Sequence, residues 1–344
     1  MATSSDRPTG PTDQFTPSVL NQLLYGHIHS AAVRAVAEHR IADRLADGPR
    51  TAERLAADGG LDAGMLRRVL RLLAMHGLFT QDAEGAFGLT EAGRALRTDV
   101  RGSQHTAALL LTDEMFRRAA DGIPDAVRTG KTSFEAAYHV SFFDHLAVSP
   151  EQRELFDSGM ASMSRRTDDL VVESYPFPAA GTVIDVGGGR GGFLHTVLCS
   201  QPALTGVLFD LPDTVSDHLL DTEEVRGRWS VRGGDFFSEV PRGGDLYLLK
   251  RILHDWSDEE CLRILASIRR AAAPGARLLV VDSVLPDNGD PHPAVELDIV
   301  MMMLVTGRER TAKEFEELFT RSGFRLNRVL ATPSLPSILE AEAV

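Results

Sequence analysis

The chain has 344 residues, 43% of them hydrophobic and 25% charged, values typical of a globular protein long enough to bury two cores. Its net charge of -13 argues against nucleic acid or an anionic membrane as a partner, because phosphate groups are bound by positively charged surfaces. Since Cys199 and Cys261 are the only cysteines, neither a disulfide framework nor a thiolate metal site is expected.

The first residues predict no fold of their own. Residues 1–17 are rich in Pro, Gly, Ser and Thr, a composition typical of a flexible tail. They lack the apolar centre of a secretory signal, and no apolar run in the chain approaches the length of a membrane span. We therefore expect a cytoplasmic protein.

Residues 18–98 are predicted to form a separate, mainly helical domain. Apolar residues recur with helical period over Val19–Leu45, Thr51 can cap a short helix, and Leu61–Gly77 carries a leucine face. Two short strands then flank a turn at Asp82–Gly85. Three helices followed by a β-hairpin is the pattern of a winged helix.

This domain has two interpretations. Arg67, Arg68 and Arg71 lie on the helix that would enter DNA, which favours a DNA-binding domain. The alternative is a dimerisation or substrate-covering module with the same shape, and the acidic charge of the whole chain favours it.

Residues 99–175 are predicted to be a helical connector that contributes to a substrate pocket. The helical pattern is interrupted at Gly130-Lys131 and at Ser149-Pro150. The last helix leads directly into the next domain, so it should overhang the site there. The bulky apolar side chains of this segment are Phe134, Phe142, Phe143, Phe156, Met160 and Met163.

Residues 176–344, which begin at the boundary marked by Pro176 and Pro178, alternate strands and helices, as in a mainly parallel sheet. Ligands of such sheets bind at the carboxyl ends of the strands. The predicted strands are Val183–Val186, Thr205–Phe209, Trp229–Gly233, Asp245–Lys250, Arg277–Val281, Phe324–Ala331 and Ser337–Glu340.

The first of these strands runs into a glycine turn, VIDVGGGRGGF, which predicts a nucleotide-type cofactor site at a helix N-terminus. Gly187, Gly189 and Gly192 fit the dinucleotide pattern, with Asp210 as an acidic ribose partner, so NAD is one candidate. Asp185, however, would be a buried carboxylate in need of a cation. The ammonium group of S-adenosylmethionine meets that need, and the methyl donor is therefore favoured.

The next strand ends extend this site. Asp210 can accept hydrogen bonds from both ribose hydroxyls, and Gly234-Asp235-Phe236 can provide an acceptor for the adenine amino group and a ring that stacks on it. Alternatively, Asp235 only caps a turn and Phe236 only belongs to the core.

The segment LLKRILHDWSDEE follows the fourth strand. Ser257 and Glu260 form a capping box for a helix through Ala273, which leaves His254 on the loop above the sheet edge. A histidine there can accept a proton near neutral pH. Further on, Met301–Met303 continue a helix, and we expect an apolar acceptor pocket lined by Phe143, Met160, Met163, Met302 and Met303.

Together, the glycine turn and the motifs FDLP, GDFF, HDWSDEEC, GRERT and MHGLF resemble the family of S-adenosylmethionine-dependent O-methyltransferases, which includes plant phenolic, acetylserotonin and bacterial antibiotic-pathway enzymes. The resemblance spans nearly the whole chain. It implies a class I methyltransferase fold, an α/β Rossmann-like sheet, preceded by a mainly α winged-helix dimerisation domain, and hence a homodimer.

The resemblance also implies roles for single residues. His254 would be the general base, flanked by Asp282, where plant members carry Glu, and by Glu309. Arg153 matches an arginine that contacts the donor in anthracycline-pathway relatives. Donor binding is further implied for Gly187, Asp210, Asp235, Phe236, Lys250 and Arg251. No metal is needed.

The sequence thus predicts an O-methyltransferase that uses S-adenosylmethionine to methylate a hydroxyl of an aromatic small molecule, such as a phenol or a polycyclic natural product, in specialised metabolism. Two alternatives remain open at this point: a winged-helix transcriptional regulator with a ligand-sensing domain, and a methyltransferase-like enzyme converted to another reaction. Retention of His254 favours methyl transfer.

Overall fold

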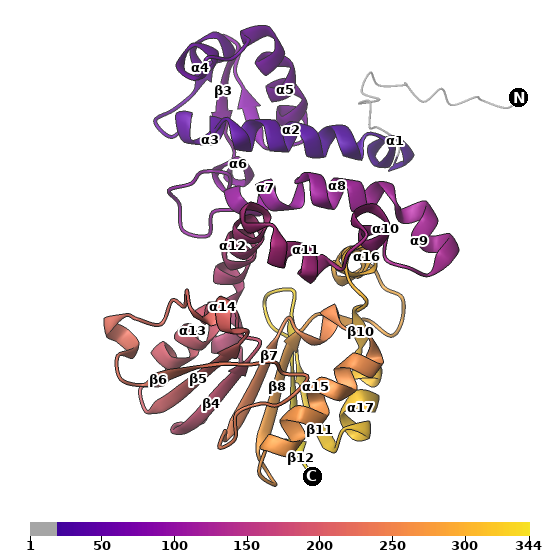
Figure 1. Cartoon of the computed structure of the whole chain (residues 1–344). Coiled ribbons are helices and arrows are strands. Elements are labelled where there is room, and N and C mark those ends of the chain that lie inside the picture. The colour runs from indigo at the N-terminus through magenta and orange to yellow at the C-terminus, as the bar shows by residue number, and fades with distance from the viewer. Residues whose placement is uncertain (1–18) are drawn as a thin grey trace, which may run out of the picture. The chain divides into compact units, whose positions relative to one another are not determined.

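The computed structural model describes residues 19–344, so the tail predicted for residues 1–17 lies outside the described residues. The chain forms two compact units that divide between Ala108 and Leu109 (Figure 1). Among the described residues, no helix combines the length and the apolar character that a membrane span requires.

The N-terminal unit consists of helices around a small antiparallel sheet. Its helices are α1 (Val19–Leu24), α2 (Gly26–Glu38), α3 (Ile41–Arg44), α4 (Ala52–Gly59), α5 (Ala63–Met75), α6 (Glu91–Arg94) and the start of α7 (His105–Leu111). The strand order is β1-β3-β2, with β1 at Arg50–Thr51, β2 at Phe79–Gln81 and β3 at Ala86–Leu89. The predicted hairpin is confirmed, and β1 is a third strand that the sequence pattern missed.

Local capping explains where these helices begin. The side chain of Thr51 accepts a hydrogen bond from the backbone N–H of Arg54, which confirms the predicted cap of α4, and Asp62 accepts one from Met65 at the start of α5. On α5, Arg67 forms an ion pair with Glu53.

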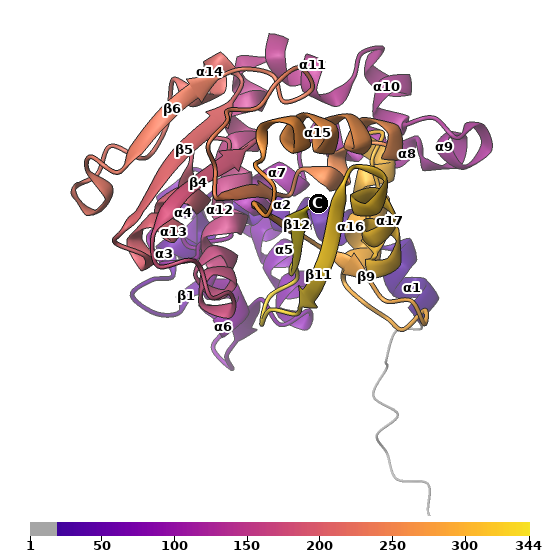
Figure 2. The same ribbon diagram turned by 90° about the horizontal axis from the view of Figure 1, so that it is seen from below.

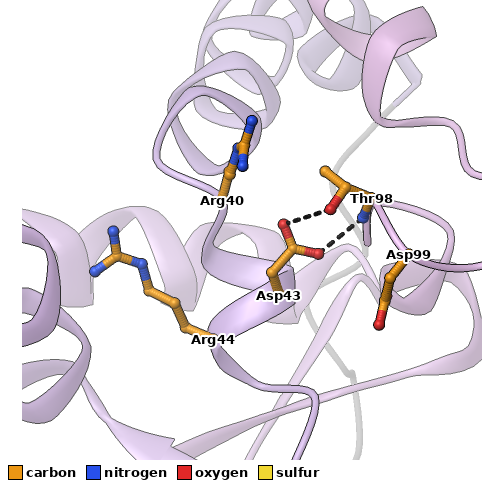
Figure 3. A pocket seen from close by; sticks show the side chains of 5 residues that line it. All are labelled: Arg40, Asp43, Arg44, Thr98 and Asp99. Carbon is orange, nitrogen blue, oxygen red and sulfur yellow. Dashed lines mark hydrogen bonds between the residues drawn. The ribbon is translucent and has the colours of Figure 1, made fainter.

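A pocket of about 390 Å³ lies within this unit, lined by Arg40, Asp43, Arg44, Thr98 and Asp99 (Figure 3). Asp43 points at Thr98 and accepts hydrogen bonds from its backbone N–H at 2.8 Å and its hydroxyl at 3.2 Å. These bonds join α3 to the chain after α6. The pocket shares no residue with the predicted site.

The C-terminal unit begins with short helices that lead into one long helix. They are α8 (Glu114–Asp121), α9 (Ile123–Thr129), α10 (Ser133–Tyr138), α11 (Phe142–Val148) and α12 (Pro150–Ser174). Both predicted interruptions are confirmed: Gly130 ends α9 in the left-handed conformation, and Pro150 is the first residue of α12.

The remainder is a seven-stranded sheet in the order β11-β12-β8-β7-β4-β5-β6. Only the pairings of β12 with β8 and β11 are antiparallel. Every predicted strand is present, and the last extends further than predicted. The strands are β4 (Gly181–Val186), β5 (Leu204–Asp210), β6 (Trp229–Gly233), β7 (Leu246–Lys250), β8 (Arg277–Asp282), β11 (Phe324–Leu330) and β12 (Ser337–Ala343).

Helices cover both faces of this sheet (Figures 1 and 2). The end of α12 and α13 (Gly192–Ser200) pack against one face, whereas α15 (Asp258–Ala271) and α17 (Ala312–Arg321) pack against the other. The smaller elements are α14 (Pro212–Val215), η1 (Glu223–Val225), η2 (Leu253–Asp255), β9 (Val284–Leu285), α16 (Ala294–Leu304) and β10 (Arg310–Thr311).

The helix that follows the fourth strand begins as predicted, with the capping box of Ser257 and Glu260. It ends at Ala271 rather than at the predicted Ala273. The physical reason is Pro274, whose ring disfavours the helical conformation of the preceding residue.

Gly307 permits a close backbone contact in this unit. An added Cβ would lie 2.0 Å from the carbonyl oxygen of His254 and 2.4 Å from the backbone nitrogen of Trp256. The chain after α16 can therefore pack against η2 only because residue 307 has no side chain.

We expect Gly307→Ala to destabilise the protein by about 1–3 kcal/mol, the usual cost of forcing an extra methyl group into packed structure. Urea unfolding followed by circular dichroism would measure the change. Gly26→Ala is the control, because an added Cβ at residue 26 meets no atom within 4 Å. Equal stability of the two variants would contradict the prediction.

Candidate active site

The glycine turn joins β4 to α13 at the carboxyl edge of the sheet. Gly187, Gly189 and Gly191 have φ values of 70°, 59° and 83°, which side chains disfavour. At Gly188, a Cβ would lie only 2.5 Å from Oδ2 of Asp185. The turn therefore brings backbone close to a buried carboxylate.

Asp185 lies in β4 just before this turn and is 1% exposed. Its Oδ2 has no hydrogen-bond partner among the described residues. Burial raises the pKa of Asp185 to about 7, an effect that the positive charge of Lys250 opposes. An open, buried carboxylate oxygen fits a cationic group such as the ammonium of S-adenosylmethionine.

Asp210 ends β5 and supports the turn. Its carboxylate accepts hydrogen bonds from the backbone N–H of Gly189 at 2.8 Å and of Leu211 at 2.7 Å. Burial raises the pKa of Asp210, while these two N–H groups lower it. An ionised carboxylate has about four acceptor positions, so the two bonds leave capacity for the hydroxyls of a ribose.

The third strand end has the geometry of a capped turn. Asp235 is exposed and accepts hydrogen bonds from the backbone N–H of Phe237 at 2.9 Å and the hydroxyl of Ser238 at 3.3 Å. Phe236 is half-buried and packs edge-on to Trp256. At Gly234, a Cβ would lie 2.6 Å from the ring of Phe209. The contacts to adenine stay a prediction.

Lys250, which ends β7, has a partner that the sequence did not reveal. Its Nζ lies 2.5 Å from Oδ1 of Asp168 on α12. Burial lowers the pKa of Lys250 and raises that of Asp168. The next residue, Arg251, has a φ of 55°, a conformation that residues other than glycine seldom adopt.

Arg153 lies in the first turns of α12. It donates a hydrogen bond to the hydroxyl of Thr214 on α14 at 2.9 Å. Both residues line a pocket of about 280 Å³, to which Asp157 and Arg190 also contribute. Arg190 belongs to the glycine turn, so the pocket adjoins the predicted donor site.

His254 lies between β7 and α15, as predicted, on the single 3-10 turn η2, and it is only 4% exposed. Its Nδ1 lies 2.8 Å from Oε1 of Glu309. Its Nε2 lies 3.6 Å from Oδ1 of Asp255, a neighbour that the sequence did not single out. The backbone N–H of Glu309 in turn donates to Asp298 of α16 at 2.8 Å.

The two acidic residues predicted to flank this histidine differ in their contacts. Glu309 is bonded to His254, whereas both carboxylate oxygens of Asp282 have no hydrogen-bond partner in the part of the chain that the structure describes. Burial raises the pKa of Asp282 to about 7 and that of Asp255 to about 6. Burial and the charge of Asp298 raise the pKa of Glu309, whereas the charges of Arg251 and Arg310 lower it.

Arg310 fixes the turn that carries His254. The guanidinium is fully buried and donates to the carbonyl oxygens of Leu253 and Trp256, both at 2.8 Å, and to Oδ1 of Asp258 at 2.7 Å. The thiol of Cys261 also faces the carbonyl oxygen of Leu253, at 3.1 Å. Arg310 belongs to the motif GRERT, but nothing in its local sequence indicated this role.

The residues predicted to line an acceptor pocket lie in one apolar cluster, with one exception. Phe143, Met160, Met163 and Met303 belong to this cluster, and Met302 does not. Met301, which was not chosen from the sequence, also belongs to it. Phe143 stacks on Trp256 with ring centroids 5.7 Å apart, which brings the cluster to the segment of His254.

Comparison with known proteins identifies the family of both parts of the chain. Residues 121–325 match the model of the O-methyltransferase domain, and residues 21–99 match the O-methyltransferase dimerisation domain. The phenazine O-methyltransferase PhzM of Lysobacter antibioticus is 40% identical over 329 residues, covering 95% of this chain and 96% of that protein.

Solved structures agree as well. CalO1, a methyltransferase of calicheamicin biosynthesis crystallised in its SAH-bound form, is 42% identical with a TM-score of 0.87, covering 94% of this chain and 97% of that one. The O-methyltransferase NcsB1 of neocarzinostatin biosynthesis, in complex with S-adenosylmethionine and 2-hydroxy-5-methyl naphthoic acid, is 33% identical with a TM-score of 0.76, covering 92% and 96%. On these matches, the chain belongs to the O-methyltransferase family.

Proposed function

We propose that this enzyme transfers a methyl group from S-adenosylmethionine to a hydroxyl of an aromatic small molecule, and that His254 accepts the proton of that hydroxyl. The observation that carries the proposal is the buried pair of His254 and Glu309, with 2.8 Å between Nδ1 and Oε1, at the sheet edge that also holds the glycine turn.

The donor site is proposed from groups whose chemistry matches the donor. The open oxygen of Asp185 suits the ammonium, Asp210 suits the ribose, and Asp235 with Phe236 suits adenine. Arg153, Gly187, Gly189, Gly234, Lys250 and Arg251 complete the proposed site. When bound, the donor's sulfonium supplies an already activated methyl group, so the protein must align the acceptor and remove a proton.

His254 is suited to take that proton. Its Nδ1 bonds to Glu309, which fixes the tautomer and leaves Nε2 as the nitrogen that can become protonated. The imidazolium formed would then be stabilised by the carboxylate of Glu309 and the nearby Asp255. A phenol, with a pKa near 10, attacks more readily when a neutral imidazole accepts its proton.

The acceptor class follows from the apolar cluster and from the relatives. Phe143, Met160, Met163 and Met303 of this cluster are proposed to line its pocket, because flat rings pack well against aromatic and thioether side chains. Met302, which lies outside the cluster, is proposed as a further lining residue from its place on α16 beside Met303. The relatives named above include enzymes of phenazine and naphthoic acid chemistry, which favours a polycyclic or phenolic natural product in specialised metabolism.

We further propose that the protein acts as a homodimer. The match of residues 21–99 to the dimerisation domain supports this. So does α1, whose apolar side chains are largely exposed, with Val19 at 73% and Leu23 at 74%.

We expect His254→Ala to lower turnover by about 10²–10⁴-fold, the usual contribution of a general base, and to leave donor binding nearly unchanged. Mass spectrometry of phenols incubated with the protein and S-adenosylmethionine would measure product that has gained one methylene unit. His39→Ala, which alters an exposed histidine, is the control. Undiminished turnover in His254→Ala would remove this residue from the mechanism.

Glu309→Gln and Asp282→Asn should separate the two acidic neighbours of His254. Glu309→Gln keeps the shape but removes a charge bonded to the imidazole, so we expect about 10–100-fold lower kcat, equivalent to a charge-assisted hydrogen bond. Asp282→Asn breaks no such bond and should cost less. Steady-state kinetics of both variants would decide, and a larger loss in Asp282→Asn would contradict the assignment.

The raised pKa values of Asp185 and Asp282, each about 7, make stability depend on pH. Because both values exceed those of the unfolded chain, their contribution is full below about pH 4 and is lost as pH rises through 7. The free energy of unfolding should therefore fall between pH 5 and pH 8, by up to about 1.4 kcal/mol per pH unit for each group. Urea titrations across this range should give a shallower fall for Asp282→Asn, and an unchanged slope would contradict the prediction.

A further inference from the structure

A buried ion pair lies beside the proposed ammonium site. Lys250 and Asp168 are 9% and 5% exposed, with 2.5 Å between Nζ and Oδ1. The ring of Phe193 lies under the same Nζ, 5.0 Å away at its centroid. Removing both charges from water costs several kcal/mol per ion. A gain in stability alone is therefore a poor explanation for the pair, and a functional role is the alternative.

The pair and Asp185 meet on one face of the sheet. Asp185 is opposite Leu248 in the pairing of β4 with β7, and Lys250 lies two residues further on, so both side chains project to the same side. Lys250 already forms an ion pair with Asp168, whereas Oδ2 of Asp185 has neither an ion-pair nor a hydrogen-bond partner among the described residues. Asp168 and Asp185 thus share the ammonium of Lys250, and the charge of Arg251 also acts on Asp168. Asp185 is therefore the carboxyl that needs a proton or a further cation for neutrality.

We propose that Asp168 is a positioning residue for the methyl donor: by holding Lys250, it keeps one oxygen of Asp185 open for the donor's ammonium group, which displaces a proton from that oxygen on binding. The inference rests on the proposed function, because it requires a donor with an ammonium group. When the donor binds, the carboxylic acid of Asp185 becomes a carboxylate paired with the ammonium, and its proton passes to the buffer.

The surroundings of Asp185 are consistent with this exchange. The charged groups that act on it are Lys250 of β7, Asp210 of β5 and Asp168 of α12, and the backbone N–H of Leu194 in α13 donates to it. Burial raises the pKa of Asp185 to about 7, so part of the free protein holds a proton there at neutral pH. A bound ammonium would lower that pKa and release the proton.

Calorimetry with S-adenosylhomocysteine tests this without turnover. Titrations at pH 7 in buffers of different ionisation enthalpy report the number of protons released on binding. The control ligand is 5′-methylthioadenosine, which keeps the adenosine and the sulfur but lacks the ammonium. For the wild-type protein, we expect release of a measurable fraction of a proton with the first ligand and none with the second.

Asp168→Asn would free Lys250 to pair with Asp185 and so occupy the open oxygen. We expect S-adenosylhomocysteine to bind about 10–100-fold more weakly, the range of a charge-assisted hydrogen bond, with proton release near zero and 5′-methylthioadenosine binding unchanged. Glu173→Gln removes the same charge from an exposed position of α12 and should change neither ligand. Asp185→Asn, a second test should Asp168→Asn not fold, should likewise abolish proton release.

The outcomes are distinct. Equal weakening of both ligands by Asp168→Asn, or proton release that persists in Asp168→Asn or Asp185→Asn, would overturn the positioning role. Failure of the wild-type protein to bind S-adenosylhomocysteine would overturn the proposed function itself. Binding of S-adenosylhomocysteine without proton release would overturn only this inference.

Discussion

A carboxylate removed from water must find a positive charge, a hydrogen-bond donor or a proton, and the C-terminal unit is arranged around that requirement. At the sheet edge, Asp185 and Asp282 are both buried with oxygens that the described residues leave unbonded. Asp185 lies within β4 and Asp282 is the last residue of β8, and neither is more than 1% exposed to water. The edge therefore holds unmet charge on two sides, one at the glycine turn and one near His254.

The positive charge of Arg251 acts on carboxyl groups at both of these places. Its charge lowers the pKa of Asp168 next to the proposed donor site and of Asp282 and Glu309 next to His254. Its backbone N–H donates to the carbonyl of Val281 at 3.0 Å, which fixes the residue despite its left-handed conformation. The charge of Arg251 thus acts on carboxyl groups of both the proposed donor site and the proposed catalytic pair.

The parts of this molecule that short sequence patterns could predict are those that local chemistry determines. The glycine turn, the strand ending at Asp210 and the capping box at Ser257 depend on residues a few positions apart. The pairing of Lys250 with Asp168 joins residues 82 positions apart by number, and no periodicity signals it. The burial of His254 was also missed, because a distant arginine holds its turn.

The apolar cluster and the strands and helix around the glycine turn come from different stretches of the chain. Most of the cluster belongs to α8, α10, α11, α12 and α16, whereas the glycine turn and the residues around it belong to β4, β5 and α13. Replacing a methionine or phenylalanine of the apolar cluster therefore leaves β4 and β5, the strands beside the glycine turn, unchanged. Such a division would allow enzymes of this family to change their acceptor substrate through substitutions in one part of the chain while the part that holds the methyl donor stays the same.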